Sequence, residues 1–224
     1  MPLFMRENMK YEAVIFDLDG TLIDTLEDLK DSINFALEQH GMPERSLEEV
    51  RTFVGNGVKK LVFRSVPENT SEELRESCLK AFKAHYITNS MNKTRPYNGI
   101  CGLVEKLKKN GVKLAVVTNK TQDAADAIMN EFFKDDFEII IGQIDGVAQK
   151  PQPDGVWYAI EKLGASKQNS VYIGDSEVDC LTAKNSGIPI IGVTWGFRGR
   201  KVLEENNADY IVDSPEEILN IITR

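Results

Sequence analysis

The chain has 224 residues, of which 42% are hydrophobic and 28% are charged, a composition typical of a globular protein with one or two domains. Its formal net charge is −8 and no basic stretch stands out, so neither nucleic acid nor an anionic membrane is an expected partner. No apolar run is long enough to span a membrane, and residues 1–10 lack the apolar core of a secretory signal. We therefore expect a cytoplasmic protein.

In chain order, the first predicted element follows a short extension, residues 1–8, which we expect to contribute little to the fold. Buried strands are predicted where short runs are rich in Val and Ile, at 13–16, 114–117, 137–141, 171–173 and 188–193. These runs do not alternate in polarity, as expected for a parallel sheet that is covered on both faces. Between them, apolar residues recur at helical spacing, as at Ile100, Leu103 and Leu107. The alternation predicts an α/β fold with a doubly wound, mainly parallel, Rossmann-like sheet.

One long insertion interrupts this alternation between the first strand and the second. A crossover needs only about a dozen residues, and the helical pattern at 99–110 already supplies it. The surplus residues show helical patterns throughout, at 26–39, 47–53, 58–66 and 72–87. We therefore predict an α/β core made of residues 9–24 and 96–224, with a small α-helical cap domain inserted at 25–95.

Polar residues follow several of the predicted strands, at the edge where open α/β sheets bind their ligands. The set comprises Asp17, Asp19, Thr118, Asn119, Asp175, Asp179 and, in a loop before a later helix, Lys150. Converging carboxylates would repel one another and shift each other's pKa values, and a hard cation such as Mg²⁺ would relieve this repulsion. Lys150 would add positive charge, while Thr118 and nearby backbone N–H groups would hold phosphate oxygens.

Each of these motifs alone has an ordinary structural explanation, because a pair of aspartates at a strand end is commonly a solvated turn. Their joint occurrence, each at a strand end or in a nearby loop, favours a functional site. Other sites lack support in the sequence, which has no phosphate-binding GxxxxGK[ST] motif and no GxGxxG after a strand. The cysteines and histidines are too dispersed to indicate a disulfide framework or a zinc site.

Four segments resemble the motifs of the haloacid dehalogenase superfamily, in its phosphatase branch. They read FDLDGTL at 16–22, VVTNK at 116–120, KPQP at 150–153 and GDSEVD at 174–179. The position of the insertion also matches the helical cap of that family. Within the family, RTFVGNGVKKLV at 51–62, RPYNGI at 95–100 and VTWGFR at 193–198 are similar to phosphoglycolate phosphatases and their pyrophosphatase relatives.

This resemblance implies the chemistry of the first motif. Asp17 would be the nucleophile that forms an aspartyl-phosphate intermediate, which divides hydrolysis into two easier steps. Asp19 would be the general acid that protonates the leaving oxygen, and then the general base that activates water. A dehalogenase needs neither a metal nor a proton for a leaving alkoxide, so Asp19 and Asp175 together favour phosphoryl transfer over carbon–halogen cleavage.

The same resemblance implies a Mg²⁺ site and a phosphate site. The metal would be bound by Asp17, Asp175 and the backbone carbonyl of Asp19. Asp179 would support the metal or its waters and would also hold Lys150. The transferring phosphoryl group would be bound by Thr118, Asn119 and Lys150.

The predicted function is Mg²⁺-dependent hydrolysis of a small phosphomonoester, with 2-phosphoglycolate as the first choice. An inorganic pyrophosphatase, a sugar-phosphate phosphatase and a phosphomutase are alternatives that would use the same machinery. A different class, a non-catalytic binding module, is disfavoured because the aspartates of the first and fourth motifs and Lys150 are all intact.

The predicted cap would close over the core, exclude bulk water and limit the size of the substrate. Gly55, Asn56 and Gly57 lie between two of its predicted helices. Glycine permits backbone conformations with positive φ and a close approach to a ligand. This stretch is therefore either a substrate-specificity loop, as the resemblance implies, or a plain helix–helix turn.

Overall fold

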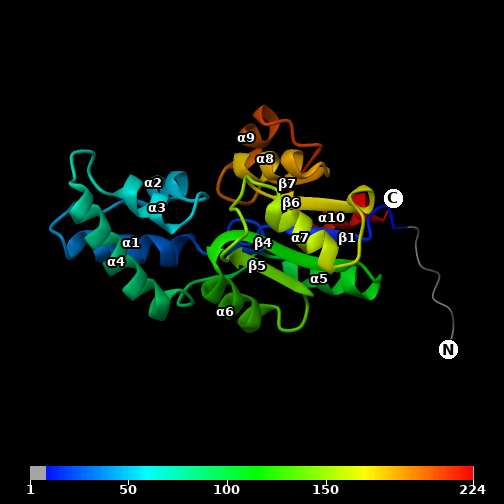
Figure 1. Ribbon diagram of the computed structural model, residues 1–224, viewed down its shortest axis with the longest axis horizontal. Coiled ribbons are helices and arrows are strands. Elements are labelled where there is room, and N and C mark those ends of the chain that lie inside the picture. The colour runs from blue at the N-terminus through cyan, green and yellow to red at the C-terminus, as the bar shows by residue number, and fades with distance from the viewer. Residues whose placement is uncertain (1–8, 224) are drawn as a thin grey trace. The chain divides into compact units, whose positions relative to one another are not determined.

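The computed structural model describes residues 9–223, so the predicted extension at 1–8 lies outside the described residues (Figure 1). The described chain divides into two compact units. Residues 23–95 form a helical unit, and the residues before and after this stretch form an α/β unit. The two chain connections between the units pair with each other as short strands, β2 (Ile23–Asp24) and β3 (Arg95–Pro96).

The α/β unit is built on a six-stranded sheet with the strand order β5-β4-β1-β6-β7-β8, in which every neighbouring pair is parallel. Its strands are β1 (Ala13–Phe16), β4 (Lys113–Thr121), β5 (Ile139–Gln143), β6 (Ser170–Gly174), β7 (Ile190–Val193) and β8 (Tyr210–Val212). The prediction of a doubly wound, mainly parallel sheet is therefore confirmed. At the centre, Phe16 of β1 lies opposite Val116 of β4 and Ile173 of β6. The residues that follow these strands consequently leave the sheet side by side.

Several strand bounds differ from the prediction: β5 begins and ends two residues later than the run at 137–141, and β7 begins at Ile190 instead of at 188. Strand β4 continues beyond the predicted end at 117 to Thr121, because the polar residues after Val117 keep an extended backbone although they break the apolar pattern. Strand β8 was not predicted, since it has only three residues at the sheet edge, and two of them are half-buried. Short edge strands carry too little apolar sequence to be recognised by pattern.

Helices cover both faces of the sheet, as Figure 1 shows for the α/β unit. One layer contains α5 (Ile100–Lys109), α6 (Gln122–Phe132) and α10 (Pro215–Ile222). The other contains α7 (Asp154–Lys162), α8 (Glu177–Ser186) and α9 (Gly199–Glu205), and a cluster of buried apolar residues lies between it and the sheet. All four residues of β1 have no exposed surface. Full burial of each Val or Ile contributes about 1.5–3 kcal/mol, so the central strand is a rigid support for the loop that follows it.

The helical unit consists of α1 (Leu26–Glu38), α2 (Leu47–Phe53), α3 (Val58–Ser65) and α4 (Glu72–Asn89). Helices α1 and α4 form its main packing, with Ile33 and Phe82 among the buried side chains. Helix α2 begins with a capping box between Ser46 and Glu49, which satisfies backbone N–H groups at its first turn. Asp28 of α1 is also buried, and it accepts hydrogen bonds from the residues just before β3.

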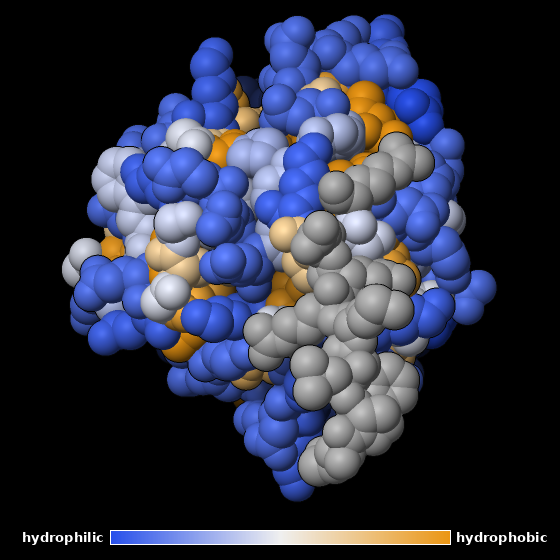
Figure 2. All heavy atoms as spheres, turned by 90° about the vertical axis from the view of Figure 1, so that its right-hand side faces the viewer, coloured by the Kyte–Doolittle hydropathy of each residue, from blue (hydrophilic) through white to orange (hydrophobic). Residues whose placement is uncertain are grey.

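The side of the molecule shown in Figure 2 is mostly hydrophilic, with hydrophobic residues visible in small areas among hydrophilic ones. Within residues 9–223, none of the helices is long and apolar enough to cross a membrane.

Candidate active site

The sequence between β1 and β2 forms a tight turn at the carboxyl end of the sheet. The backbone N–H of Asp17 still donates to the carbonyl of Ile173 at 2.8 Å, so this residue is held beside the end of β6. Gly20 has a φ of +87°, and a Cβ atom there would lie only 2.7 Å from the carboxylate oxygens of Asp175. Glycine is thus required at this position by both backbone conformation and space. The turn brings the first and fourth motifs into contact.

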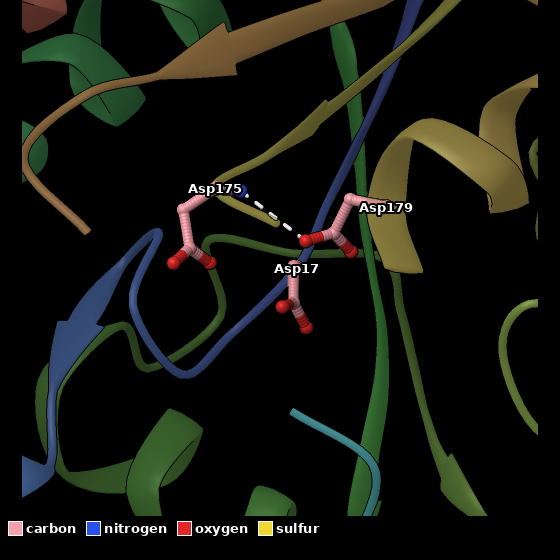
Figure 3. Close-up of side chains that lie close together, drawn as sticks. All are labelled: Asp17, Asp175 and Asp179. Atoms are coloured by element: carbon pink, nitrogen blue, oxygen red, sulfur yellow. Dashed lines mark hydrogen bonds between the residues drawn. The ribbon is translucent and has the colours of Figure 1, made fainter. Parts of the chain in front are cut away.

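Three aspartates gather where these loops meet (Figure 3). Asp17 follows β1, Asp175 follows β6, and Asp179 comes from the first turn of α8. All three are buried, and each has a carboxylate oxygen within 4.8 Å of the others. The loop after β7 closes the other side of Asp175, where the backbone N–H of Phe197 donates to its Oδ2 at 2.7 Å.

This gathering of buried carboxylates has a strong electrostatic effect. Burial raises the pKa of Asp17 to about 7, although the positive charge of Lys150 counteracts the shift. Burial also raises the pKa of Asp175 well above its ordinary value, and the charges of Asp179 and Asp17 add to this shift. A cation between Asp17 and Asp175 would stabilise both in their charged forms. Oxygen donors of this kind fit a hard divalent cation such as Mg²⁺.

Lys150 provides positive charge inside the cluster. Its ammonium group lies 2.7 Å from Asp17 Oδ1 and 2.8 Å from Asp179 Oδ1, and it donates to the hydroxyl of Tyr172 at 3.1 Å. Burial alone would lower the pKa of this lysine, but the two carboxylates raise it well above its ordinary value. Lys150 is therefore a fixed cation beside the carboxylate of Asp17.

Both carboxylate oxygens of Asp179 accept hydrogen bonds. One oxygen accepts from Lys150 and from the hydroxyl of Tyr172, at 2.8 and 3.3 Å. The other accepts from the backbone N–H groups of Asp175 and Ser176, at 3.2 and 3.1 Å, and from the Ser176 hydroxyl at 2.6 Å. Ser176 and Asp179 also form the capping box of α8, so the same contacts fix the start of this helix.

The remaining predicted residues of the core lie around this cluster. Asp19 is partly exposed, and both of its carboxylate oxygens accept from the ammonium group of Lys120, at 3.0 and 3.2 Å. Thr118 and Asn119 are buried at the end of β4. The amide of Asn119 donates to the backbone carbonyl of Lys150 at 3.1 Å, which ties the second motif to the third.

The sequence matches the family described as haloacid dehalogenase-like hydrolase over residues 14–193. The chain belongs to this family. A phosphoglycolate phosphatase of Haemophilus influenzae (strain 86-028NP) is 32% identical over 96% of this chain and 100% of its own length. One from Neisseria meningitidis serogroup A / serotype 4A (strain DSM 15465 / Z2491) is 34% identical over 92% of both chains.

Solved structures agree with this assignment. A crystal structure from Lactobacillus delbrueckii subsp. bulgaricus ATCC BAA-365 has a TM-score of 0.92 and 36% identity, covering 96% of this chain and 100% of its own. A predicted phosphoglycolate phosphatase from Haemophilus somnus 129pt has a TM-score of 0.89 and 31% identity, covering 96% and 99%. The predictions of the haloacid dehalogenase-like family and of a phosphatase are confirmed.

The predicted specificity residues of this haloacid dehalogenase-like hydrolase lie in the helical unit, between α2 and α3. Gly55 and Gly57 both have positive φ, at +112° and +84°, and Gly57 is the N-cap of α3. Asn56 Oδ1 accepts from the guanidinium of Arg64 at 2.8 Å, and the same group donates to the carbonyl of Phe53 at 2.9 Å. The loop is thus held in a defined conformation by α3.

Two residues that contact predicted site residues were not singled out by the sequence. Tyr172 is fully buried within β6, and its hydroxyl accepts from Lys150 and shares its single proton between Asp179 Oδ1 and the carbonyl of Val117, at 3.3 and 3.1 Å. A tyrosine in an otherwise apolar buried strand is a usable signal, because its hydroxyl needs a polar partner. Lys120 was visible as part of VVTNK, but its pairing with Asp19 depends on how distant loops meet.

Proposed function

We propose that this chain is a Mg²⁺-dependent phosphatase of small phosphomonoesters, with 2-phosphoglycolate as the first candidate, acting through an aspartyl-phosphate on Asp17. The observation that carries this proposal is the buried carboxylate of Asp17, which lies 2.7 Å from the ammonium of Lys150 and beside Asp175. The similarity of the chain to the phosphoglycolate phosphatases of Haemophilus influenzae and Neisseria meningitidis supports the choice of substrate.

In the first step, a carboxylate oxygen of Asp17 attacks phosphorus while the bond from phosphorus to the ester oxygen breaks. Asp19 gives its proton to that departing oxygen, so the alcohol leaves as a neutral group. Lys150 holds the Asp17 carboxylate in place through its contact with Oδ1 and offsets negative charge on the phosphoryl oxygens. Thr118 and Asn119, buried at the end of β4, complete the proposed phosphate-binding group.

In the second step, water attacks the phosphorus atom of the aspartyl-phosphate. Asp19, now a carboxylate, accepts the proton of this water, and the bond between phosphorus and the Asp17 oxygen breaks. Inorganic phosphate leaves and the Asp17 carboxylate is restored. One side chain thus serves as acid and then as base, which keeps the proton count balanced over a turnover.

The proposed metal site uses the carboxylates of Asp17 and Asp175 and the backbone carbonyl of Asp19. Mg²⁺ bound there supplies charge neutralisation for the phosphoryl group and for the buried carboxylates. Both oxygens of Asp179 already accept hydrogen bonds, so we assign this residue to orienting Lys150 and the loop of Asp175. This arrangement supports Asp179 as an outer partner of the metal and not as a direct ligand.

We further propose that Gly55, Asn56 and Gly57 form a specificity loop that contacts the leaving group of the substrate. The two positive-φ glycines and the hydrogen bond from Arg64 to Asn56 support this proposal, because they give the loop a fixed shape that a simple flexible turn does not need. Its leaving-group contacts would distinguish 2-phosphoglycolate from pyrophosphate and sugar phosphates.

The deciding experiment measures phosphate release from 2-phosphoglycolate, pyrophosphate and a panel of sugar phosphates, with Mg²⁺ and with a chelator. We expect Mg²⁺-dependent hydrolysis of 2-phosphoglycolate with the highest kcat/KM of the panel. Acid quenching during turnover should trap a phosphorylated protein that is labile to hydroxylamine.

Asp17→Asn should retain less than about a tenth of the wild-type kcat, a barrier increase of more than roughly 1.4 kcal/mol. It should also give no trapped phosphoprotein. Asp145→Asn is the matched control, because this aspartate is exposed on the same unit. Wild-type activity in Asp17→Asn would show that Asp17 is not the nucleophile.

A further inference from the structure

Lys120 is a second buried lysine at the carboxyl end of the sheet, and the proposed reaction gives it no role. Only 6% of the residue is exposed. Its ammonium group lies 3.0 and 3.2 Å from the two carboxylate oxygens of Asp19. Its backbone is also fixed, because β4 remains extended through Thr121 and the N–H of Lys120 donates to Thr118 Oγ1 at 3.2 Å. The ammonium therefore has a defined position beside the proposed general acid.

This position places Lys120 next to the leaving group. In the proposed reaction, the ester oxygen makes a hydrogen bond with Asp19. Two consecutive contacts of hydrogen-bond length bring that oxygen within about 6 Å of the lysine nitrogen. A substituent one or two bonds beyond the ester oxygen can consequently reach the ammonium group. The phosphoryl group, in contrast, has Lys150 as its proposed cation, because the ammonium group of Lys150 lies 2.7 Å from Asp17 Oδ1.

The charges of the site give a reason for a second ammonium group. Lys150 lies between Asp17 and Asp179, and Asp175 adds a further buried negative charge. The proposed Mg²⁺ would offset these carboxylates, but the phosphoryl group of the substrate brings its own negative charge into the site. A neutral leaving group would experience that charge only weakly, whereas a leaving group that is itself negatively charged would be repelled. A fixed cation on the Asp19 side would offset that repulsion at the point where the leaving group must lie.

We propose that Lys120 binds an anionic substituent of the leaving group, and that it selects phosphate esters carrying an acidic group close to the ester oxygen. The inference rests on the proposed function, since it takes Asp19 as the residue that contacts the leaving oxygen. It assigns part of the substrate selection to the α/β unit itself. 2-Phosphoglycolate, whose carboxylate is bonded directly to the ester carbon, belongs to this substrate class.

The test compares two esters that differ in charge but hardly in size, 2-phosphoglycolate and its primary amide. The kcat/KM of each is measured for the wild type, for Lys120→Met, which keeps the chain length without charge, and for Lys120→Arg, which keeps the charge. Lys120→Met should lower the kcat/KM for 2-phosphoglycolate relative to the kcat/KM for its amide by about tenfold or more, as expected for loss of a hydrogen bond between charged groups. Lys120→Arg should retain most of the wild-type ratio.

The outcomes separate this inference from the proposed function. Equal losses for both esters in Lys120→Met would mean that Lys120 only positions Asp19, and would overturn the inference while leaving the phosphatase intact. A wild type that hydrolyses neither ester would overturn the proposed function and, with it, the inference. If thermal unfolding shows that Lys120→Met does not fold, the same ratio in Lys120→Gln decides the question.

Discussion

Each unit of this protein contains a buried aspartate, and their surroundings differ sharply. Asp28 of the helical unit is 2% exposed, and it accepts hydrogen bonds from the backbone N–H groups of Lys93 and Thr94 and from the Thr94 hydroxyl. Asp17 of the α/β unit is 8% exposed, but it lies against Lys150 among other buried carboxylates. Burial of a carboxylate therefore does not by itself indicate catalysis; the identity of its partners does.

The two aspartates differ in whether the fold already supplies all the partners that their carboxylates need. Neutral donors surround Asp28 and fix the chain that leads into β3, so its charge is stabilised by the fold alone. For Asp17, burial and neighbouring negative charges raise the pKa to about 7, which means that the charged form needs additional positive charge. A site that is incomplete without a cation is suited to binding one, whereas Asp28 already has its full set of partners for a structural role.

The largest expected effects concern the division of work between Asp19 and Asp175. Both Asp19→Asn and Asp175→Asn should lower kcat by about 100-fold or more, the size expected for loss of a general acid–base or metal-binding group. Only Asp175→Asn should weaken Mg²⁺ binding, because Asp19 is proposed to contribute its backbone carbonyl. Calorimetric titration of Mg²⁺ into each variant measures this difference. An equal loss of Mg²⁺ affinity in both would contradict the assignment of separate roles.

A smaller effect is expected at Asp28, and it should affect stability instead of turnover. Asp28→Asn replaces an acceptor of several hydrogen bonds by an amide whose N–H groups face other donors, at a cost of about 2 kcal/mol. The free energy of unfolding in urea should fall by this amount, while the kcat of the folded protein stays close to that of the wild type.

Asp145→Asn again provides an exposed control, and it should change neither the free energy of unfolding nor kcat appreciably. A loss of turnover in folded Asp28→Asn comparable to that in Asp19→Asn would break the contrast between the two units. Buried charge would then have to be considered functional in the helical unit as well.

The sequence predicted the central strands and the residues at their ends because both depend on local patterns. Strand β1 coincides with the apolar run at 13–16, and the parallel sheet brings Asp17 and Asp175 to one edge. The contacts of Lys120 and Tyr172 could not be predicted in the same way. Lys120 pairs with a residue 101 positions away, and this pairing depends on strand register and on side-chain conformation, which periodicity does not encode.

The smallest effect is expected in the helical unit, at the loop formed by Gly55, Asn56 and Gly57. Asn56→Ala removes the acceptor of the Arg64 hydrogen bond while leaving the two positive-φ glycines in place. If this loop contacts the leaving group, kcat/KM for 2-phosphoglycolate should fall by about threefold more than kcat/KM for 4-nitrophenyl phosphate, because a phosphoryl contact would affect both equally.

A second variant of the same contact is Arg64→Ala, which removes the donor to Asn56 and also the donor to the Phe53 carbonyl. A specificity loop predicts that both variants change the ratio between the two substrates in the same direction, since both release Asn56 from its fixed position. A plain turn predicts that both lower the free energy of unfolding and leave the ratio unchanged. In that case substrate selection would rest on the α/β unit, where the charge of Lys120 lies beside Asp19, and the helical unit would contribute no discrimination through this loop.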